Sequence, residues 1–213
     1  MNRSKFDSTF IAETGLLVAI EIVMKLTGLG SVPVGPLYMS FLTVPIAIAA
    51  MMLGPAAGAI TGAVFGLVSF YDAITGVSVM TGAFFQIDPL NTFVLCVVMR
   101  ILMGTAVGFF YRALRRGMPS HRTVCYLLGS LSAPLLNTFF FMGYICLIFY
   151  RTDFVQNLVT KLGAANPVMF VLLLVGMQGL VEAVVCGAVG TIVARALDPF
   201  LARQSFGRKQ RAV

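Results

Sequence analysis

Six stretches of this 213-residue chain are apolar and long enough to cross a lipid bilayer. A membrane helix needs roughly 20 apolar residues to cross about 30 Å of hydrocarbon. With 59% hydrophobic and 11% charged residues, the composition also departs from that of soluble domains. We therefore predict an all-α integral membrane protein whose six transmembrane helices form one bundle and a single domain, residues 1–213. The predicted spans are Thr9–Leu29, Leu37–Leu53, Ala56–Ala73, Leu90–Leu114, Val124–Tyr150 and Val168–Leu197.

The positions of the basic residues predict how this bundle is oriented. Lys and Arg that flank membrane spans are held on the cytoplasmic side. Two lie before the first span, four lie between the fourth and fifth, and five lie at or after the end of the sixth. Both termini are therefore predicted to be cytoplasmic, with a basic tail at about 198–213. This tail either contacts anionic membrane lipid or is a solvated topology signal.

The connections on the opposite, outer side are longer and rich in turn residues. They are Thr27–Pro36, Asp72–Pro89 and Arg151–Pro167. Long loops on one side of a small bundle often carry function, so they are either a gate over a cavity or ordinary solvent loops. On the inner side, Leu53-Gly54-Pro55 predicts a tight helical hairpin, because Gly ends helices and Pro begins them.

Four polar side chains are predicted at the middle depth of the bilayer. Counting from the span ends gives a similar depth for Arg100, Asn137, Gln178 and Glu182. Since a charge at this depth costs at least about 2.5 kcal/mol, an ionisable residue there is by default a functional hypothesis. One interpretation is the floor of an outward-facing pocket, in which Arg100 binds a substrate carboxylate. The alternative is that Arg100 and Glu182 neutralise each other while the amides hold helices together.

Other polar and aromatic residues lie near the predicted outer ends of the spans. They either line the mouth of the pocket or form an interfacial belt. They are Tyr38, Ser40, Phe70, Tyr71, Gln86, Asn91 and Tyr144. On the first span, Glu21 and Lys25 are four residues apart, which predicts a salt bridge along one helical face.

Stripes of small residues give several spans a flat face. Such faces let helices approach closely, either within a bundle or against a partner helix. On the fourth span, Gly104 and Gly108 are interpreted as internal packing. Stripes on the first and third spans are predicted to form a partner interface, which consists of Gly15, Ala19, Gly58, Gly62 and Gly66.

The sequence lacks the motifs of several enzyme classes. No GxxxxGK[ST] motif is present for phosphate binding, and the one histidine, His121, lies in a basic loop. The four cysteines lack metal-ligand spacing. We therefore expect no enzymatic activity, no cofactor and no metal on this chain. The strongly apolar composition also argues against a nucleic-acid partner.

Several motifs taken together resemble a known transporter family. They are Pro36-Leu37 with Phe41-Leu42-Thr43-Val44-Pro45, Leu53-Gly54-Pro55 followed by Gly58, Val64–Phe70, Arg100–Gly104, Asn137–Phe139 and Gly179–Glu182. In these residues the chain resembles the substrate-binding S components of energy-coupling factor (ECF) vitamin transporters. The run Phe65–Phe70 is most similar to that of the pantothenate-binding members.

The resemblance implies a multi-pass protein of a prokaryotic cell membrane that captures a vitamin from outside with high affinity. It also implies a transmembrane T component and two ATPase subunits as partners, which fits the missing phosphate-binding motif. The family's AxxxA docking motif on the first span corresponds to Gly15 and Ala19 here. The resemblance places the substrate pocket beneath the outer loops, among the last three spans.

Pantothenate is a small anion with hydroxyl groups and an amide, so one cation with amide neighbours suits it. Arg100, Asn137 and Gln178 supply that set. Folate or riboflavin needs a larger cavity, and an S component for one of these or a related vitamin is the first alternative. A membrane assembly protein without transport activity is the second, and it predicts no soluble ligand.

Overall fold

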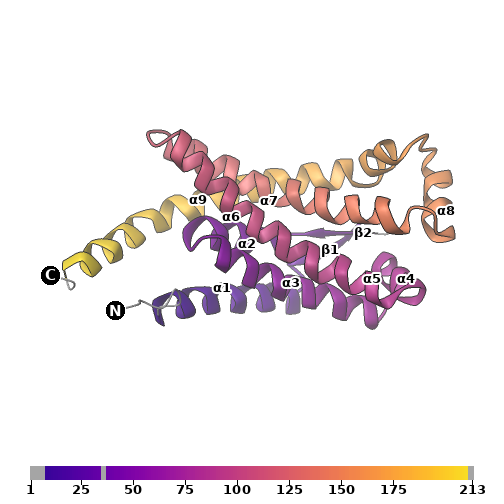
Figure 1. The fold of residues 1–213 in the computed structure, drawn as a ribbon, viewed down its shortest axis with the longest axis horizontal. Helices are drawn as coiled ribbons and strands as arrows, with labels where there is room; N and C mark the ends of the chain where they lie inside the picture. The colour runs from indigo at the N-terminus through magenta and orange to yellow at the C-terminus, as the bar shows by residue number, and fades with distance from the viewer. Residues whose placement is uncertain (1–7, 35–36, 211–213) are drawn as a thin grey trace.

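The computed structural model describes residues 8–34 and 37–210, except for the side chains of residues 33, 34, 37, 38 and 199–210. Figure 1 shows an elongated bundle of helices with one small β-hairpin. The elements are α1 (Ser8–Leu26), β1 (Ser31–Val34), β2 (Leu37–Ser40), α2 (Thr43–Met52), α3 (Pro55–Ile74), α4 (Val79–Ile87), α5 (Pro89–Phe93), η1 (Val94–Val98), α6 (Met99–Gly117), α7 (Arg122–Tyr144), η2 (Ile145–Phe149), α8 (Asp153–Leu162) and α9 (Pro167–Gln210). The segments η1 and η2 are π-helical turns within longer helices.

Within the described residues, four helices are long and apolar enough to cross a membrane. They are Pro55–Ile74, Pro89–Gly117, Arg122–Phe149 and Pro167–Asp198. These ranges agree within a few residues with the last four predicted spans. The agreement is expected, because a helix is the simplest way for a long apolar run to satisfy its backbone groups in hydrocarbon. α9 continues as a helix to Gln210, through most of the predicted basic tail.

The first two predicted spans differ from the other four. α1 contains Glu13, Glu21 and Lys25 within its 19 residues. α2 has only ten residues, or about 15 Å of helix. The prediction of one continuous helix over Leu37–Leu53 was wrong at its start, because Leu37–Ser40 forms a strand. The described residues therefore form a helical bundle of the multi-span membrane type, in which four helices are long and apolar.

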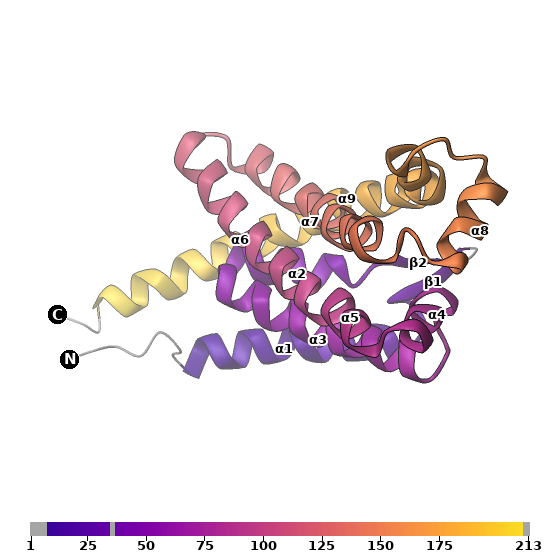
Figure 2. The ribbon, with the colours of Figure 1, turned by 45° about the vertical axis from the view of Figure 1, so that its right-hand side comes forward.

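The β-hairpin occupies part of the predicted loop Thr27–Pro36 and the start of the second predicted span. Its strands pair antiparallel, with Ser31 opposite Ser40 and Val34 opposite Leu37. The other two predicted outer loops also contain helices, α4 and α8. Figure 2 shows the hairpin, α4, α5 and α8 gathered at one end of the bundle. We call this the α4–α8 end.

α2 lies in the centre of the bundle, in contact with α3, α6, α7 and α9. All of its residues from Thr43 to Met51 are buried. A helix that is apolar on every side is stable only where neighbours cover it completely. Gly54, with φ of 101°, ends this segment and Pro55 begins α3, so the predicted helical hairpin is present.

α3 and α6 approach each other so closely that glycine is required between them. A Cβ on Gly58 would collide with the carbonyl oxygen of Gly104, and one on Gly66 would lie 2.7 Å from the Cα of Val97. Gly62 packs in the same way on the backbone of Arg100. The stripe Gly58, Gly62 and Gly66 therefore packs within the chain, and it fixes the backbone of α6 beside α3.

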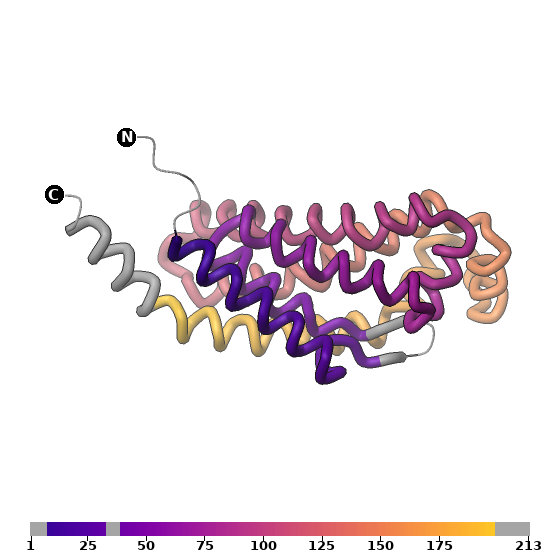
Figure 3. The backbone as a smooth tube through the Cα atoms, turned by 90° about the horizontal axis from the view of Figure 1, so that it is seen from below, coloured from indigo at the N-terminus to yellow at the C-terminus, as the bar shows by residue number. Residues whose placement is uncertain are grey.

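α1 lies on the outside of the bundle, as the views in Figures 1 and 3 both show. It contacts α2 and α3. Figure 3 shows that it starts at the end of the bundle where α6 and α7 are connected and runs toward the α4–α8 end. Its outer face is consequently free of covering helices from the described chain.

Candidate functional site

Arg100 is held in the interior of the bundle and is only 6% exposed. Its Nη1 donates a hydrogen bond to Oδ1 of Asn137 on α7. The guanidinium carbon lies 4.0 Å from the ring centre of Phe65 on α3 and 4.6 Å from that of Phe141 on α7. Aromatic faces attract cations, so the two rings stabilise the charge that the low-polarity interior disfavours. A positive charge is thus fixed at membrane depth with an amide and two rings as its neighbours.

Glu182 and Gln178 reach the same place from α9. A cavity of about 50 Å³ is lined by both of them together with Arg100 and Asn137. Oε1 of Glu182 accepts a hydrogen bond from the backbone N–H of Ser40 in β2, and Gln178 interacts with the same carboxylate. The four residues predicted to share one depth are therefore neighbours in space. Arg100 and Glu182 have different hydrogen-bond partners, so they do not form the direct salt bridge that the alternative interpretation required.

A second cavity, of about 60 Å³, lies on another side of Arg100. Its wall combines a cation, a carboxylate and several hydroxyl groups with two aromatic rings. The polar and aromatic residues are Ser31, Ser40, Phe65, Ser69, Asp72, Ser78, Thr81, Arg100 and Phe141. A bound water needs roughly 10 to 15 Å³ on the same measure, so each cavity holds a few waters but no vitamin-sized molecule.

Three residues that line this second cavity each carry a buried polar atom with no hydrogen-bond partner among the described residues. These atoms are Nε of Arg100, Oγ of Ser40 and Oγ1 of Thr81. Each of these residues is at most 6% exposed. Leaving a buried donor or acceptor unpaired costs about 1 to 3 kcal/mol, and buried polar groups are almost always paired. Three such atoms around one cavity therefore favour a polar molecule as their shared partner.

Lys25 forms its salt bridge with Asp72, near the C-terminal end of α3. The predicted Glu21–Lys25 pair is therefore wrong, because a long-range partner replaces the local one. Asp72 also lines the second cavity, so this ion pair ties α1 to the wall of the cavity. Glu21 is 2% exposed, and neither of its carboxylate oxygens has a hydrogen-bond partner within the described part of the chain.

Asn91 and Tyr144 contact each other rather than either cavity. The Tyr144 hydroxyl donates to Oδ1 of Asn91 over 2.6 Å. The backbone N–H and the Nδ2 group of Asn91 in turn donate to the carboxylate of Asp88, at 3.0 and 2.7 Å. These bonds favour the charged carboxylate, so they lower the pKa of Asp88 below its ordinary value. The network joins the start of α5 to α7.

Of the remaining predicted mouth residues, Phe70, Tyr71 and Gln86 do not line either cavity. Phe70 packs edge-on against Phe85 and Phe93, with ring centres 5.8 and 5.2 Å away. Tyr71 is 65% exposed, and Gln86 is also exposed. Tyr38 belongs to β2, and its side chain lies outside the described part.

The two predicted interface residues on α1, Gly15 and Ala19, are exposed. A Cβ on Gly15 would meet no described atom within 4 Å, in contrast to the glycines of α3. Around them, Ile11, Leu16 and Val23 are each more than half exposed, at 61%, 64% and 57%. α1 thus presents an uncovered apolar face with a small-residue stripe in it.

Sequence reasoning missed several residues of the two cavities. Phe65 was noted only within the run that carries the family resemblance, Phe141 was not singled out, and Thr81 lies in α4, where a loop was predicted. Asp72 was a detectable signal, since it is an acid at the end of an apolar span. Ser40 was predicted near a span end, but the other small hydroxyls gave no signal, because Ser and Thr are common throughout membrane helices.

Comparison with known proteins covers nearly the whole bundle. Residues 9–194 match the family described as "ECF transporter, substrate-specific component". No curated protein matches the chain. The matched range begins in α1 and ends in α9, so it includes both cavities and all four long apolar helices. This chain therefore belongs to the family of substrate-specific (S) components of ECF transporters, which are non-catalytic, multi-pass membrane proteins of prokaryotes.

Proposed function

We propose that this S component captures pantothenate, or a vitamin of similar size and charge, at the two cavities around Arg100. The observation that carries the proposal is the convergence of three unpaired, buried polar atoms, from Arg100, Ser40 and Thr81, on one cavity. A ligand that supplies acceptors and hydroxyl groups satisfies all three. Binding therefore replaces an unfavourable arrangement with hydrogen bonds, which favours tight binding.

Each part of the ligand has a complementary partner in this arrangement. Nε of Arg100 is the free donor for a carboxylate, since Nη1 is already bonded to Asn137. The serine and threonine hydroxyls suit the hydroxyl and amide groups of pantothenate. Glu182 is bonded to the backbone of Ser40, which keeps the second charge occupied away from the ligand carboxylate.

The cavities must enlarge before a vitamin enters. Their combined space is far below the 300–1,000 Å³ of ordinary small-molecule sites. The β-hairpin and α4 supply Ser31, Ser40, Ser78 and Thr81 to the wall, and both elements lie at the α4–α8 end. We propose that these two elements separate to admit substrate from outside, with six spans and both termini in the cytoplasm.

Transport requires partners, because this family's components are not themselves catalytic. The family membership implies a T component and ATPase subunits. We propose the exposed α1 face around Gly15 and Ala19 as the surface for the T component. The stripe on α3 has no free face to offer, because α6 covers it.

The test is equilibrium binding of labelled pantothenate to the purified full chain in detergent. Arg100→Ala removes the proposed carboxylate partner, and Arg116→Ala, an exposed arginine on the same helix, is the matched control. We expect Arg100→Ala to abolish binding and Arg116→Ala to leave it unchanged, with both variants folded by thermal unfolding. Folate and riboflavin are included as competitors.

The outcomes of this experiment test the proposed substrate and the proposed site separately. Suppose that the wild type does not bind pantothenate but co-purifies with a different vitamin, and that Arg100→Ala loses this vitamin. That result would refute the proposed substrate and retain the proposed site. Binding that is equal in wild type and folded Arg100→Ala would refute the site.

A further inference from the structure

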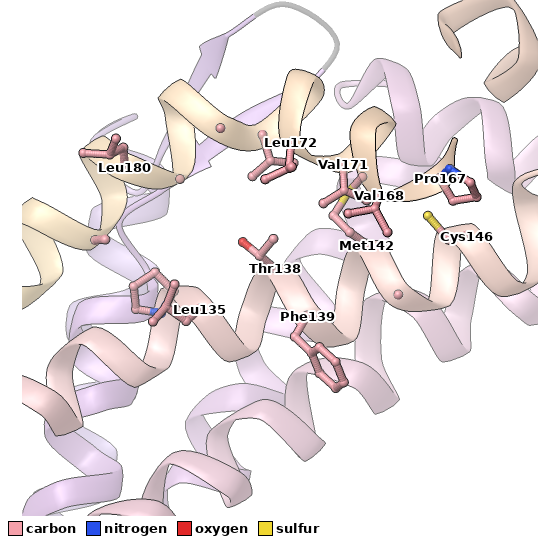
Figure 4. A pocket seen from close by; sticks show the side chains of 16 residues that line it. Leu135, Thr138, Phe139, Met142, Cys146, Pro167, Val168, Val171, Leu172 and Leu180 are labelled. Atoms are coloured by element: carbon pink, nitrogen blue, oxygen red, sulfur yellow. The ribbon is translucent and has the colours of Figure 1, made fainter. Parts of the chain in front are cut away.

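An apolar groove of about 650 Å³ runs between α7 and α9, beside the smaller of the two cavities around Arg100. Figure 4 shows Leu135, Thr138, Phe139 and Met142 of α7, with Cys146 of η2, on one side of it. Across from them lie α9 side chains, labelled Pro167, Val168, Val171, Leu172 and Leu180. None of its 16 lining residues is charged. The groove is open to the outside of the bundle, because Phe139, Val168 and Leu172 are 70%, 69% and 65% exposed.

Glycines create the depth of this groove. A Cβ on Gly143 of α7 or on Gly176 of α9 would meet no described atom within 4 Å. By contrast, glycines at the α3–α6 contact are needed because a Cβ there would collide with backbone. A glycine within a helix is less favourable than alanine, so a glycine without a packing role inside the chain suggests that something else occupies the space.

The position of the groove identifies its surroundings as lipid. Both walls are helices long and apolar enough to span a membrane. The lining extends along α9 from Pro167 to Ala183, about 24 Å of helix, whereas one leaflet of hydrocarbon is roughly 15 Å thick. The groove is therefore long enough for an acyl chain that enters from the surface of its leaflet.

The volume favours an acyl chain over a partner helix. A helix segment about 24 Å long and about 10 Å in diameter occupies on the order of 2,000 Å³. The groove offers about 650 Å³. A helix would rest on its rim and leave the floor empty, whereas a single flexible chain can fill it.

Charges at the α4–α8 end complement a phosphate headgroup. Arg151 and Lys161 are exposed and lie between η2 and α9, with Asp153 as the one acid in that segment. Arg151 follows the lining residue Cys146 by five positions, and Lys161 precedes the lining residue Pro167 by six. Both cations therefore belong to the connection between the two helical segments that line the groove, and they supply positive charge for a lipid phosphate at that end.

We propose that the groove binds one acyl chain of an anionic phospholipid, with the phosphate near Arg151 and Lys161. Thr138, Met142 and Val175 line both this groove and the 50 Å³ cavity beside Arg100. The bound chain therefore closes the lateral side of the polar cluster and keeps it separate from the bilayer. The proposal does not depend on which vitamin is transported.

The test uses the full chain in vesicles of phosphatidylethanolamine and phosphatidylglycerol. A trace of phosphatidylglycerol carries a photoreactive diazirine midway along one acyl chain, and labelled residues are mapped by mass spectrometry. We expect labelling to concentrate on the groove residues of α7 and α9. Even labelling of all exposed helices, or cross-links from the groove to a second protein chain, would overturn the proposal.

Two variants introduce a larger side chain into the groove: Gly176→Phe from the α9 wall and Gly143→Leu from the α7 wall. We expect each to lower groove labelling about tenfold, because the new side chain displaces at least two buried methylenes of the lipid. Ile192→Phe is the matched control on α9, since Ile192 is 68% exposed and outside the groove lining. Its groove labelling should equal that of the wild type. Unchanged labelling in both folded filling variants would contradict the proposal.

A separate experiment tests the proposed position of the lipid phosphate. Replacing Arg151 and Lys161 together by Gln should remove the preference of the groove for labelled phosphatidylglycerol over phosphatidylethanolamine carrying the same diazirine. An unchanged preference would overturn the assignment of the phosphate to these two residues.

Discussion

At the scale of single residues, the chain keeps the positive charge of Arg100 inside a membrane bundle and leaves it available to bind a ligand. Arg100 has one amide acceptor and two aromatic neighbours, while the carboxylate of Glu182 is bonded to the hairpin. A direct ion pair would satisfy both charges and leave nothing for a ligand. Because Arg100 and Glu182 have different partners, a ligand-binding role for Arg100 is physically reasonable.

The hydrogen bond from Arg100 to Asn137 should position the guanidinium for its ligand. Asn137→Ala removes that acceptor, and hydrogen bonds to charged groups contribute about 1.5 to 3 kcal/mol. We therefore expect substrate binding to weaken roughly 10- to 100-fold, measured by isothermal titration. Asn157→Ala, which changes an exposed amide in α8, is the matched control. Equal affinity of Asn137→Ala and wild type would contradict the positioning role.

Asp88 should make stability depend on pH on the acid side. Its pKa is lowered in the folded chain by the two bonds from Asn91. The stabilisation is therefore complete above the unfolded pKa of about 3.9 and is lost as pH falls through the lower folded value. Thermal unfolding should show Asp88→Ala below wild type at neutral pH and close to it in acid.

Asn91→Ala removes the side-chain bond from Nδ2 to the Asp88 carboxylate and keeps the backbone N–H bond, so it should show a smaller convergence of the same sign at low pH. A difference between wild type and either variant that stays constant from neutral to acidic pH would refute the role of the Asp88 charge.

At the scale of elements, the sequence predicts the long helices well and the short ones poorly. Apolar runs of membrane length admit few structures other than a helix, so the last four spans were located within a few residues. The hairpin at Ser31–Ser40 and the helices α4 and α8 were missed. The hairpin contains Gly and Pro and α4 contains Gly, so local signals there favoured loops. In α8, by contrast, apolar residues recur at helical spacing, so this helix was detectable from the sequence.

A similar contrast explains which residues of the candidate site could be predicted from the sequence. Depth counting brought Arg100, Asn137, Gln178 and Glu182 together, because a helix advances by a fixed rise per residue. It could not predict Thr81, which reaches the cavity only through the fold of α4, or the pairing of Lys25 with Asp72. Contacts between distant elements depend on tertiary packing, which spacing along one helix does not determine.

Gly104 should tolerate no side chain. A Cβ there would collide with the carbonyl oxygen of Gly58, and overpacking costs about 1 to 3 kcal/mol. Gly104→Ala should therefore lower the thermal midpoint of the chain even though alanine favours helix. Gly117→Ala, at the end of the same helix, meets no described atom within 4 Å and should not lower it. A midpoint for Gly104→Ala equal to that of Gly117→Ala would show that the α3–α6 contact is looser than described.

The Lys25–Asp72 pair should slow ligand release by tying α1 to the wall of the cavity. Lys25→Gln or Asp72→Asn breaks a partly exposed pair, and such pairs contribute up to about 1 kcal/mol, equivalent to roughly fivefold in rate. Stopped-flow measurements should show faster dissociation in each single variant and no further increase in the double variant. Additive effects of the two substitutions would indicate that the residues act independently.

At the scale of the whole molecule, the two ends and the two flanks of the bundle have different roles. The α4–α8 end surrounds the polar cavities, α1 offers an uncovered small-residue face, and the α7–α9 flank carries the apolar groove. The long helices form the constant frame, since α2 is buried among four of them. We thus propose separate surfaces of the bundle for substrate capture and for partner docking.

Docking on the T component should depend on the α1 face. Ala19→Trp places a large ring on a surface that is proposed to approach a helix closely. We expect loss of co-purification with the T component, with thermal unfolding used to confirm a folded chain. Ile192→Trp, on the exposed side of α9, should co-purify normally. Normal co-purification of Ala19→Trp would place the docking surface elsewhere.

The measurement that tests the account most directly is an experimental structure of the chain with its substrate bound. The account predicts a ligand that contacts Nε of Arg100 and the hydroxyls of Ser40 and Thr81, within a cavity enlarged by movement of the hairpin or α4. Only ordered water at these three atoms, with the ligand bound at another place, would contradict it.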